Sequence, residues 1–219
     1  MRKIETKDLE KILSKIELSK PTRIDPAAVS KSAKMPFKAL VISEVIYCRN
    51  LELLKSTLVL INCGQYLGAT ILTRSILESF SVLFYLCKIV DASIASKSLE
   101  KVDDKFMQIL FGGRRDYNSY QAINILTLIE KVKSEVPSFS ENYDILSEYA
   151  HPNWSGCAKT FGIIDKNNLL VELMNSNNLI ELSLINSILF ATETLFIDHY
   201  KKLKIILLEF AQLCEKIRN

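Results

Sequence analysis

Glycine, proline and histidine are scarce in this chain, and each shortage excludes some folds or sites. The 219 residues include only six glycines and five prolines, which favours long helices over a turn-rich β fold. With two histidines and five cysteines, and no Cys-x-x-Cys pair, a zinc site is not expected. The sequence therefore predicts neither a metal nor a cofactor.

The motifs of several common enzyme classes are also missing. The chain has no phosphate-binding P-loop, no Gly-x-Gly-x-x-Gly turn, no His-Glu-x-x-His helix and no Gly-x-Ser-x-Gly elbow. Their absence argues against most nucleotide hydrolases, dinucleotide oxidoreductases, zinc peptidases and α/β-hydrolases. Whether the protein is an enzyme at all stays open at this point.

Long uninterrupted apolar runs are missing as well. Arg74 and Glu78 break the most apolar stretch, residues 58–90, before it reaches the ~18–20 apolar residues that a membrane span requires. Charged side chains occur throughout the N-terminal segment, which does not resemble a signal peptide. The cysteines are scattered, and three lie in apolar helical stretches, so we expect buried free thiols. We therefore expect a cytoplasmic protein without a membrane segment.

Positive charge is concentrated near the N-terminus. The whole chain has a formal net charge of +3, whereas residues 1–38 alone carry ten basic and five acidic side chains. A basic arm of this kind can bind RNA or an acidic partner surface. The alternative, which we favour, is a solvated amphipathic helix followed by a linker.

Hydrophobic periodicity predicts a series of helices. Residues 5–19 have the pattern of a short amphipathic helix, and three prolines within 20–38 indicate a linker. Gly64 separates two long helical segments, which are expected to form an antiparallel hairpin. Helices are expected after the linker at 37–62, 65–90, 93–110, 119–135, 138–150 and 179–217.

One segment breaks this helical pattern. Residues 159–173 contain short apolar runs on both sides of the polar sequence Asp165–Asn168, which is typical of a β-hairpin. The predicted fold class is therefore all-α, an antiparallel helical bundle with a small β-hairpin inserted before the long C-terminal helix. We expect an N-terminal helix and basic linker arm over 1–36 and a single bundle domain over 37–219.

A charged pair lies inside the apolar segment 66–90. Arg74 and Glu78 are four residues apart, so their side chains share one helix face. Charges in a core helix are costly unless they pair or line a polar cavity. Two interpretations stay open: a structural ion pair, or a polar site in which Arg74 binds an anionic group and Glu78 orients it.

A second polar cluster occurs at Tyr143, Ser147 and His151, which follow one helix face at intervals of four residues. His151 lies at the expected end of the helix, where the helix dipole favours a protonated imidazole that can act as a general acid or base. The alternative, which we favour, is that His151 caps the helix and Tyr143 is a core aromatic. Ser147 and His151 alone do not make a catalytic triad.

Two segments, Gly64–Glu78 and Tyr143–Pro152, resemble motifs of a group of bacterial helical proteins related to the HEPN superfamily. In that group an Arg-Ser-x-x-Glu helix is followed by a Tyr/Leu-Ser helix that ends in His. The resemblance covers roughly residues 40–160. The matching positions here are Arg74, Glu78, Tyr143, Ser147 and His151.

The resemblance implies a helical binding or interaction module in a bacterial stress, toxin–antitoxin or phage-defence setting, acting as a homodimer or with another protein partner. Its alternative is a degenerate or rearranged metal-independent ribonuclease, with His151 as general acid or base, Arg74 stabilising the phosphorane charge and the basic arm holding RNA. Active HEPN ribonucleases carry an Arg a few residues before the His. The corresponding positions here are Asp144, Ile145 and Leu146, so we favour the binding module.

Overall fold

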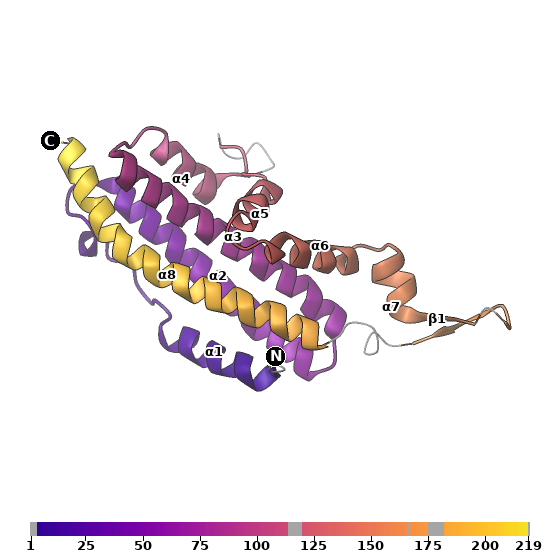
Figure 1. Cartoon of the computed structure of the whole chain (residues 1–219). Helices are drawn as coiled ribbons and strands as arrows, with labels where there is room; N and C mark the ends of the chain where they lie inside the picture. The colour runs from indigo at the N-terminus through magenta and orange to yellow at the C-terminus, as the bar shows by residue number, and fades with distance from the viewer. Residues whose placement is uncertain (1–3, 114–119, 166, 175–181, 219) are drawn as a thin grey trace.

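Long antiparallel helices make up most of the molecule in the computed structural model, which describes residues 4–113, 120–165, 167–174 and 182–218 (Figure 1). The helices are α1 (Thr6–Leu18), α2 (Lys34–Asn62), α3 (Tyr66–Ser96), α4 (Val102–Phe111), α5 (Ile125–Lys133), α6 (Ser138–Ala150), α7 (Lys159–Phe161) and α8 (Leu182–Arg218). A short 3₁₀ helix, η1 (Pro26–Ala28), a short π-helix, η2 (Trp154–Ala158), and two strands complete the described structure. The predicted all-α bundle with one small hairpin is confirmed.

The turn between α2 and α3 forms the predicted helical hairpin. Gly64 has a φ of 72°, a left-handed conformation that a residue without Cβ adopts at little cost. The next amide, Gln65 N, donates to Leu60 O at 2.8 Å and closes the end of α2. α3 runs to Ser96, beyond the expected end at Val90, and stops where Lys97 adopts a left-handed conformation with a φ of 52°.

α3 is the central helix of the bundle and contacts α2, α8, α5 and α6. It is the one described helix that is long and apolar enough to cross a membrane, but 56% of its most apolar window is buried inside the protein. The core helix of a soluble bundle has the same composition, so the helix alone does not indicate a membrane protein. The expectation that the chain has no membrane segment stays a prediction.

α1 is packed into the bundle rather than separated from it. Its apolar face, with Leu9, Ile12 and Ile16, is buried against α2 and α8 (Figure 1). Tyr47 Oη on α2 donates to Ile16 O at 2.6 Å. α2 begins at Lys34, so the expected domain boundary at residue 36 falls in the first turn of this helix.

α6 begins at Ser138 as expected but lacks the expected side-chain cap. The sequence Ser138-x-x-Glu141 has the pattern of a capping box, but Pro137 is the residue that precedes the helix, and no side chain caps it. Pro137 already has helical dihedral angles, φ −53° and ψ −40°, which proline adopts readily at a helix start. α5 begins at Ile125, six residues after the expected start, and is capped by Asn124, whose side chain accepts from Leu126 N.

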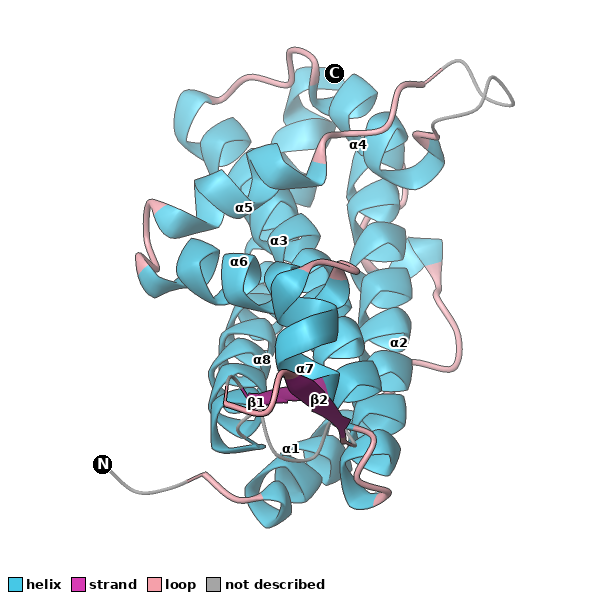
Figure 2. Cartoon of the chain, turned by 90° about the vertical axis from the view of Figure 1, so that its right-hand side faces the viewer, coloured by secondary structure: helices cyan, strands magenta, loops and turns pink. Residues whose placement is uncertain are grey.

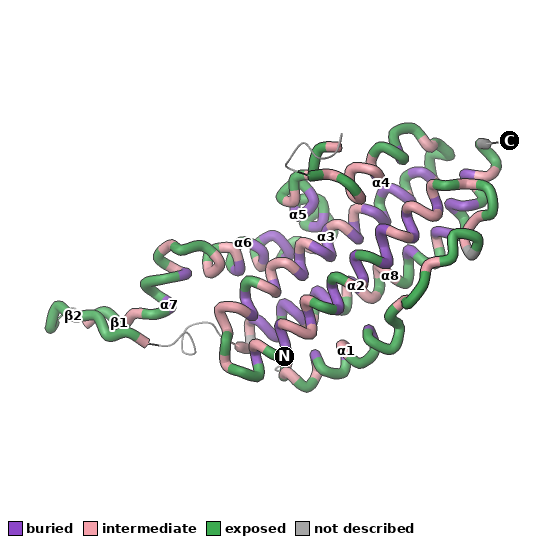
Figure 3. Tube along the Cα trace, turned by 180° about the vertical axis from the view of Figure 1, so that it is seen from behind, coloured by how far each residue is buried: buried purple, intermediate pink, exposed green. Residues whose placement is uncertain are grey.

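The strands β1 (Gly162–Asp165) and β2 (Leu170–Leu173) form the predicted antiparallel hairpin and stand out among the helices in Figure 2. The carboxylate of Asp165 accepts hydrogen bonds from the backbone amides of Asn167 and Asn168, which stabilise the turn. With α7 the hairpin projects away from the bundle, and in Figure 3 it is mostly exposed whereas the bundle helices are buried on one side. We call Gly162–Leu173 the hairpin arm.

Candidate functional site

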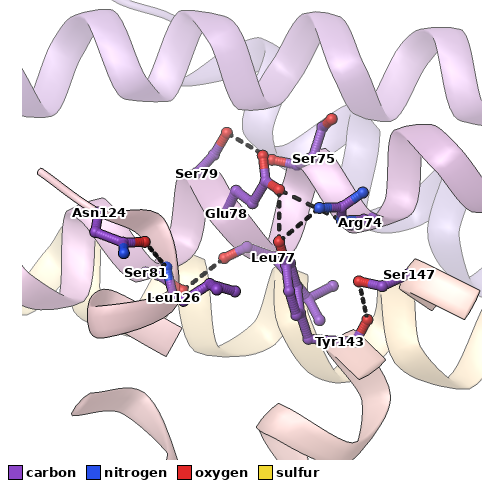
Figure 4. A network of polar contacts seen from close by, with 10 residues as sticks. All are labelled: Arg74, Ser75, Leu77, Glu78, Ser79, Ser81, Asn124, Leu126, Tyr143 and Ser147. Carbon is purple, nitrogen blue, oxygen red and sulfur yellow. Dashed lines mark hydrogen bonds and ion pairs between the residues drawn. The ribbon is translucent and has the colours of Figure 1, made fainter. Parts of the chain in front are cut away.

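Three of the five predicted site residues meet where α6 crosses α3. Arg74 Nη2 donates a hydrogen bond to Tyr143 Oη at 2.9 Å, and Tyr143 Oη donates to Glu78 Oε1 at 2.9 Å (Figure 4). Arg74 Nε and Glu78 Oε1 lie 3.5 Å apart and form an ion pair. The Arg74 guanidinium also lies 5.0 Å from the centre of the Tyr143 ring, within cation–π range.

This network is half-buried. The side chains of Arg74 and Glu78 are each 27% exposed, whereas Tyr143 is 2% exposed. Burial raises the pKa of the Tyr143 phenol above its ordinary value, and the hydrogen bond from Arg74 opposes this shift. The phenol therefore stays protonated at neutral pH, and its O–H donates a hydrogen bond to the Glu78 carboxylate.

Arg74 keeps unused hydrogen-bonding capacity. Its buried Nε forms no hydrogen bond in the described part of the chain. The Glu78 carboxylate, 3.5 Å away, is close enough for an ion pair but is not placed to accept a hydrogen bond from it. In Figure 4 the terminal nitrogen that does not bind Tyr143 points away from the network. The arrangement can hold the register of α3 and α6, and it can also offer one guanidinium edge to an anion.

Ser147 on α6 and His151, the residue that follows this helix, do not join the network. The Ser147 hydroxyl donates to Tyr143 O of its own helix at 2.7 Å. His151 is exposed and ends α6, with its backbone amide donating to Ser147 O. Among the described residues no hydrogen bond or ion pair joins the His151 side chain to Arg74, and the ribonuclease alternative stays a prediction.

Metal ligands and thiols are dispersed. The part of the chain that the structure describes contains no group of three or more His, Cys, Asp or Glu residues that could hold a metal ion. All five cysteines are free. Cys87 and Cys214 are buried as expected, but Cys63 and Cys157 are exposed, since they lie at the end of α2 and in the short π-helix η2 rather than in the core.

Sequence reasoning missed a fully buried acid on α8. Glu193 is 0% exposed, and Asn50 Nδ2 donates to its two carboxylate oxygens at 3.0 and 2.9 Å. Burial raises the pKa of Glu193 to about 8, against the smaller opposing effect of the Asn50 hydrogen bond. The carboxyl is therefore largely protonated at neutral pH. Its signal in the sequence is a single acid at a helical core position between Thr192 and Phe196.

A second buried acid, Glu44 on α2, lies near the same helix interface. It is 3% exposed, pairs with Lys204, and accepts a hydrogen bond from Tyr200 Oη at 2.7 Å. Glu44 thus has a cation and a phenol as partners, whereas the side-chain donor that Glu193 binds is a neutral amide.

The hairpin arm has two different faces. Because paired residues on neighbouring strands share a face, the register puts acidic and apolar side chains on one side and apolar residues alone on the other. The mixed face consists of Ile163, Asp165, Leu170 and Glu172. The apolar face consists of Gly162, Ile164, Val171 and Leu173. Its three side chains are 48%, 56% and 87% exposed, respectively.

No protein-family model, curated protein or solved structure matches the chain. The resemblance to HEPN-related proteins therefore stays a prediction.

Proposed function

We propose that this protein is a helical interaction module that associates with a second copy of itself through the hairpin arm. One observation carries the proposal: the face formed by Gly162, Ile164, Val171 and Leu173 is entirely apolar, and its three side chains are exposed to solvent. An isolated two-stranded hairpin is at best marginally stable in water. An apolar patch on such an element is typical of a binding surface.

The composition of the arm fits a second copy as the partner. The apolar face carries no charge, so the same face of a second chain covers it without leaving a charge buried, as a two-fold symmetric contact requires. Asp165 and Glu172 lie on the opposite face and stay in water. The resemblance to HEPN-related proteins implies a homodimer or another protein partner, which agrees with this proposal.

In this proposal the network of Arg74, Glu78 and Tyr143 has a supporting role. It ties α6 to the central helix α3 through two hydrogen bonds and a cation–π contact. Because α6 leads through η2 and α7 into the arm, this link fixes the point from which the arm projects (Figure 1). The setting that the resemblance implies, in bacterial stress or phage defence, belongs to the same proposal.

Sedimentation of arm variants tests the proposal. We expect the wild type to dimerise in a concentration-dependent manner, because a face of three side chains is small beside the roughly 20–30 residues that each partner contributes to a standard interface. Val171→Lys with Leu173→Lys places two charges on the apolar face and should give monomers. Ile163→Lys with Leu170→Lys adds the same charges to the mixed face and is the matched control.

The control pair should dimerise as the wild type does, and circular dichroism should show unchanged helix content in both double variants. A wild type that stays monomeric at every concentration would contradict the proposal. So would equal weakening of association by the two double variants, because charge alone would then explain the effect.

A further inference from the structure

A groove with a volume of about 380 Å³ lies where the C-terminal end of α1 meets α2 and α8. Its size falls in the ~300–1,000 Å³ range of small-molecule sites. α1 contributes Leu18, α2 contributes Tyr47, and α8 contributes Ile197 and Tyr200. The groove is distinct from the hairpin arm and from the network around Arg74.

The aromatic side of the groove offers ring surface only. The rings of Tyr47 and Tyr200 lie 4.4 Å apart between centres, and Tyr200 stacks on Phe196 at an angle of 8°. Both hydroxyls are used inside the protein: Tyr47 donates to Ile16 O, and Tyr200 donates to Glu44. A bound molecule therefore meets apolar ring surface here and not phenol donors.

The charged side chains of the groove all have the same sign. Of the residues that line it, only Lys15 and Lys201 are charged. Within the described part of the chain neither ammonium forms an ion pair or a side-chain hydrogen bond. Burial raises the pKa of both Tyr47 and Tyr200, so neither phenol adds a negative charge. The buried acid Glu44, which accepts a hydrogen bond from Tyr200, already pairs with Lys204.

We propose that this groove binds a small organic acid with an apolar body. The ring or chain of the ligand packs on Tyr47, Tyr200 and Ile197, and its carboxylate meets Lys15 and Lys201. Leu18, which is 89% exposed at the end of α1, is covered when the ligand binds. Binding here does not depend on dimerisation through the arm.

Calorimetric titration with 2-naphthoate tests this site, and the uncharged 2-naphthylmethanol is the comparison ligand. We expect the alcohol to bind at least about tenfold more weakly, because it lacks the charge that the lysines attract. Lys15→Glu with Lys201→Glu should weaken naphthoate binding by about tenfold or more. Lys7→Glu with Lys216→Glu changes the net charge equally on the same two helices away from the groove and should alter binding by less than about twofold.

Three results would overturn the proposal. The first is the absence of naphthoate binding to the wild type. The second is equal weakening by the two charge-reversed variants, because the general field of the protein would then explain the effect. The third is that the protein co-sediments with phosphatidylglycerol vesicles but does not bind the soluble acid. The lysines and α1 would then bind a lipid surface.

Discussion

The helical bundle and the hairpin arm differ in the solvent exposure of their apolar side chains. In the bundle, Phe80 and Leu77 of α3 are completely buried, whereas Val171 and Leu173 of the arm are 56% and 87% exposed. Burial of apolar surface stabilises a fold, and this stabilisation alone accounts for the apolar residues of the bundle. Those of the arm contribute little to folding, and a partner that covers them explains their position better.

The largest expected loss of stability follows from a substitution in the bundle core. Phe80 packs against Phe139 and His199, with ring centres 5.5 and 5.2 Å away. Phe80→Ala should lower the free energy of unfolding by about 3–5 kcal/mol through lost burial and the cavity left behind. Val171→Ala on the arm should change it by less than about 0.5 kcal/mol. Urea denaturation of the two variants measures both values.

Similar losses for the two variants would contradict the comparison, because the arm would then be part of the cooperative core. The denaturations should be run at low protein concentration, so that association does not add to the stability of the arm.

The buried acid of the bundle predicts a dependence on pH. Burial raises the pKa of folded Glu193 to about 8, above its ordinary value, so the folded state binds this proton more tightly than the unfolded state. The stabilising contribution is complete below the unfolded pKa and is lost as pH rises toward about 8. Between about pH 5.5 and about pH 7.5 we expect a loss of roughly 2–3 kcal/mol from this group, at ~1.4 kcal/mol per pH unit.

Glu193→Gln isolates this effect, because glutamine keeps the shape and the hydrogen-bonding partner Asn50 but does not titrate. The difference in unfolding free energy between wild type and variant should shift in favour of the variant as the pH rises. A difference that stays constant across this range would show that Glu193 is ionised in the folded protein at all these pH values.

A smaller loss of stability is expected from the network of Arg74, Glu78 and Tyr143. Variants of this network distinguish a structural link from a catalytic site. Tyr143→Phe removes the hydrogen bonds to Arg74 and Glu78, so the free energy of unfolding should fall by about 1–2 kcal/mol. His151→Ala at the exposed end of α6 should cost less than about 0.5 kcal/mol. Thermal denaturation measures both, and an RNA cleavage assay accompanies it.

We expect no cleavage of RNA by the wild type. Cleavage that disappears in both Arg74→Ala and His151→Ala, with melting temperatures close to the wild type, would support the ribonuclease alternative and contradict a purely supporting role for the network.

Local patterns in the sequence predicted most of the fold. The 3.6-residue periodicity located the bundle helices, and the polar residues Asp165–Asn168 between two apolar runs located the hairpin. Helix ends were predicted less well, since Pro137 rather than a capping box starts α6 and α3 extends to Ser96. Such ends depend on backbone conformation and on neighbouring helices.

Contacts between distant residues were harder to predict. The pairing of Arg74 and Tyr143 was anticipated only as a shared site, through the resemblance to a family. The hydrogen bonds between Asn50 and Glu193 join positions 143 residues apart, and no periodicity indicates which helices face each other. The groove beside α1 likewise depends on how three helices meet.

Hydrogen–deuterium exchange at two protein concentrations tests the central claim most directly, because it reports on the arm itself. If a second copy covers the arm, the backbone amides of Gly162–Leu173 should exchange more slowly at high concentration, while those of α3 keep the same slow exchange at both. Exchange in the arm that does not change with concentration would contradict the proposal that the arm joins two copies of the protein.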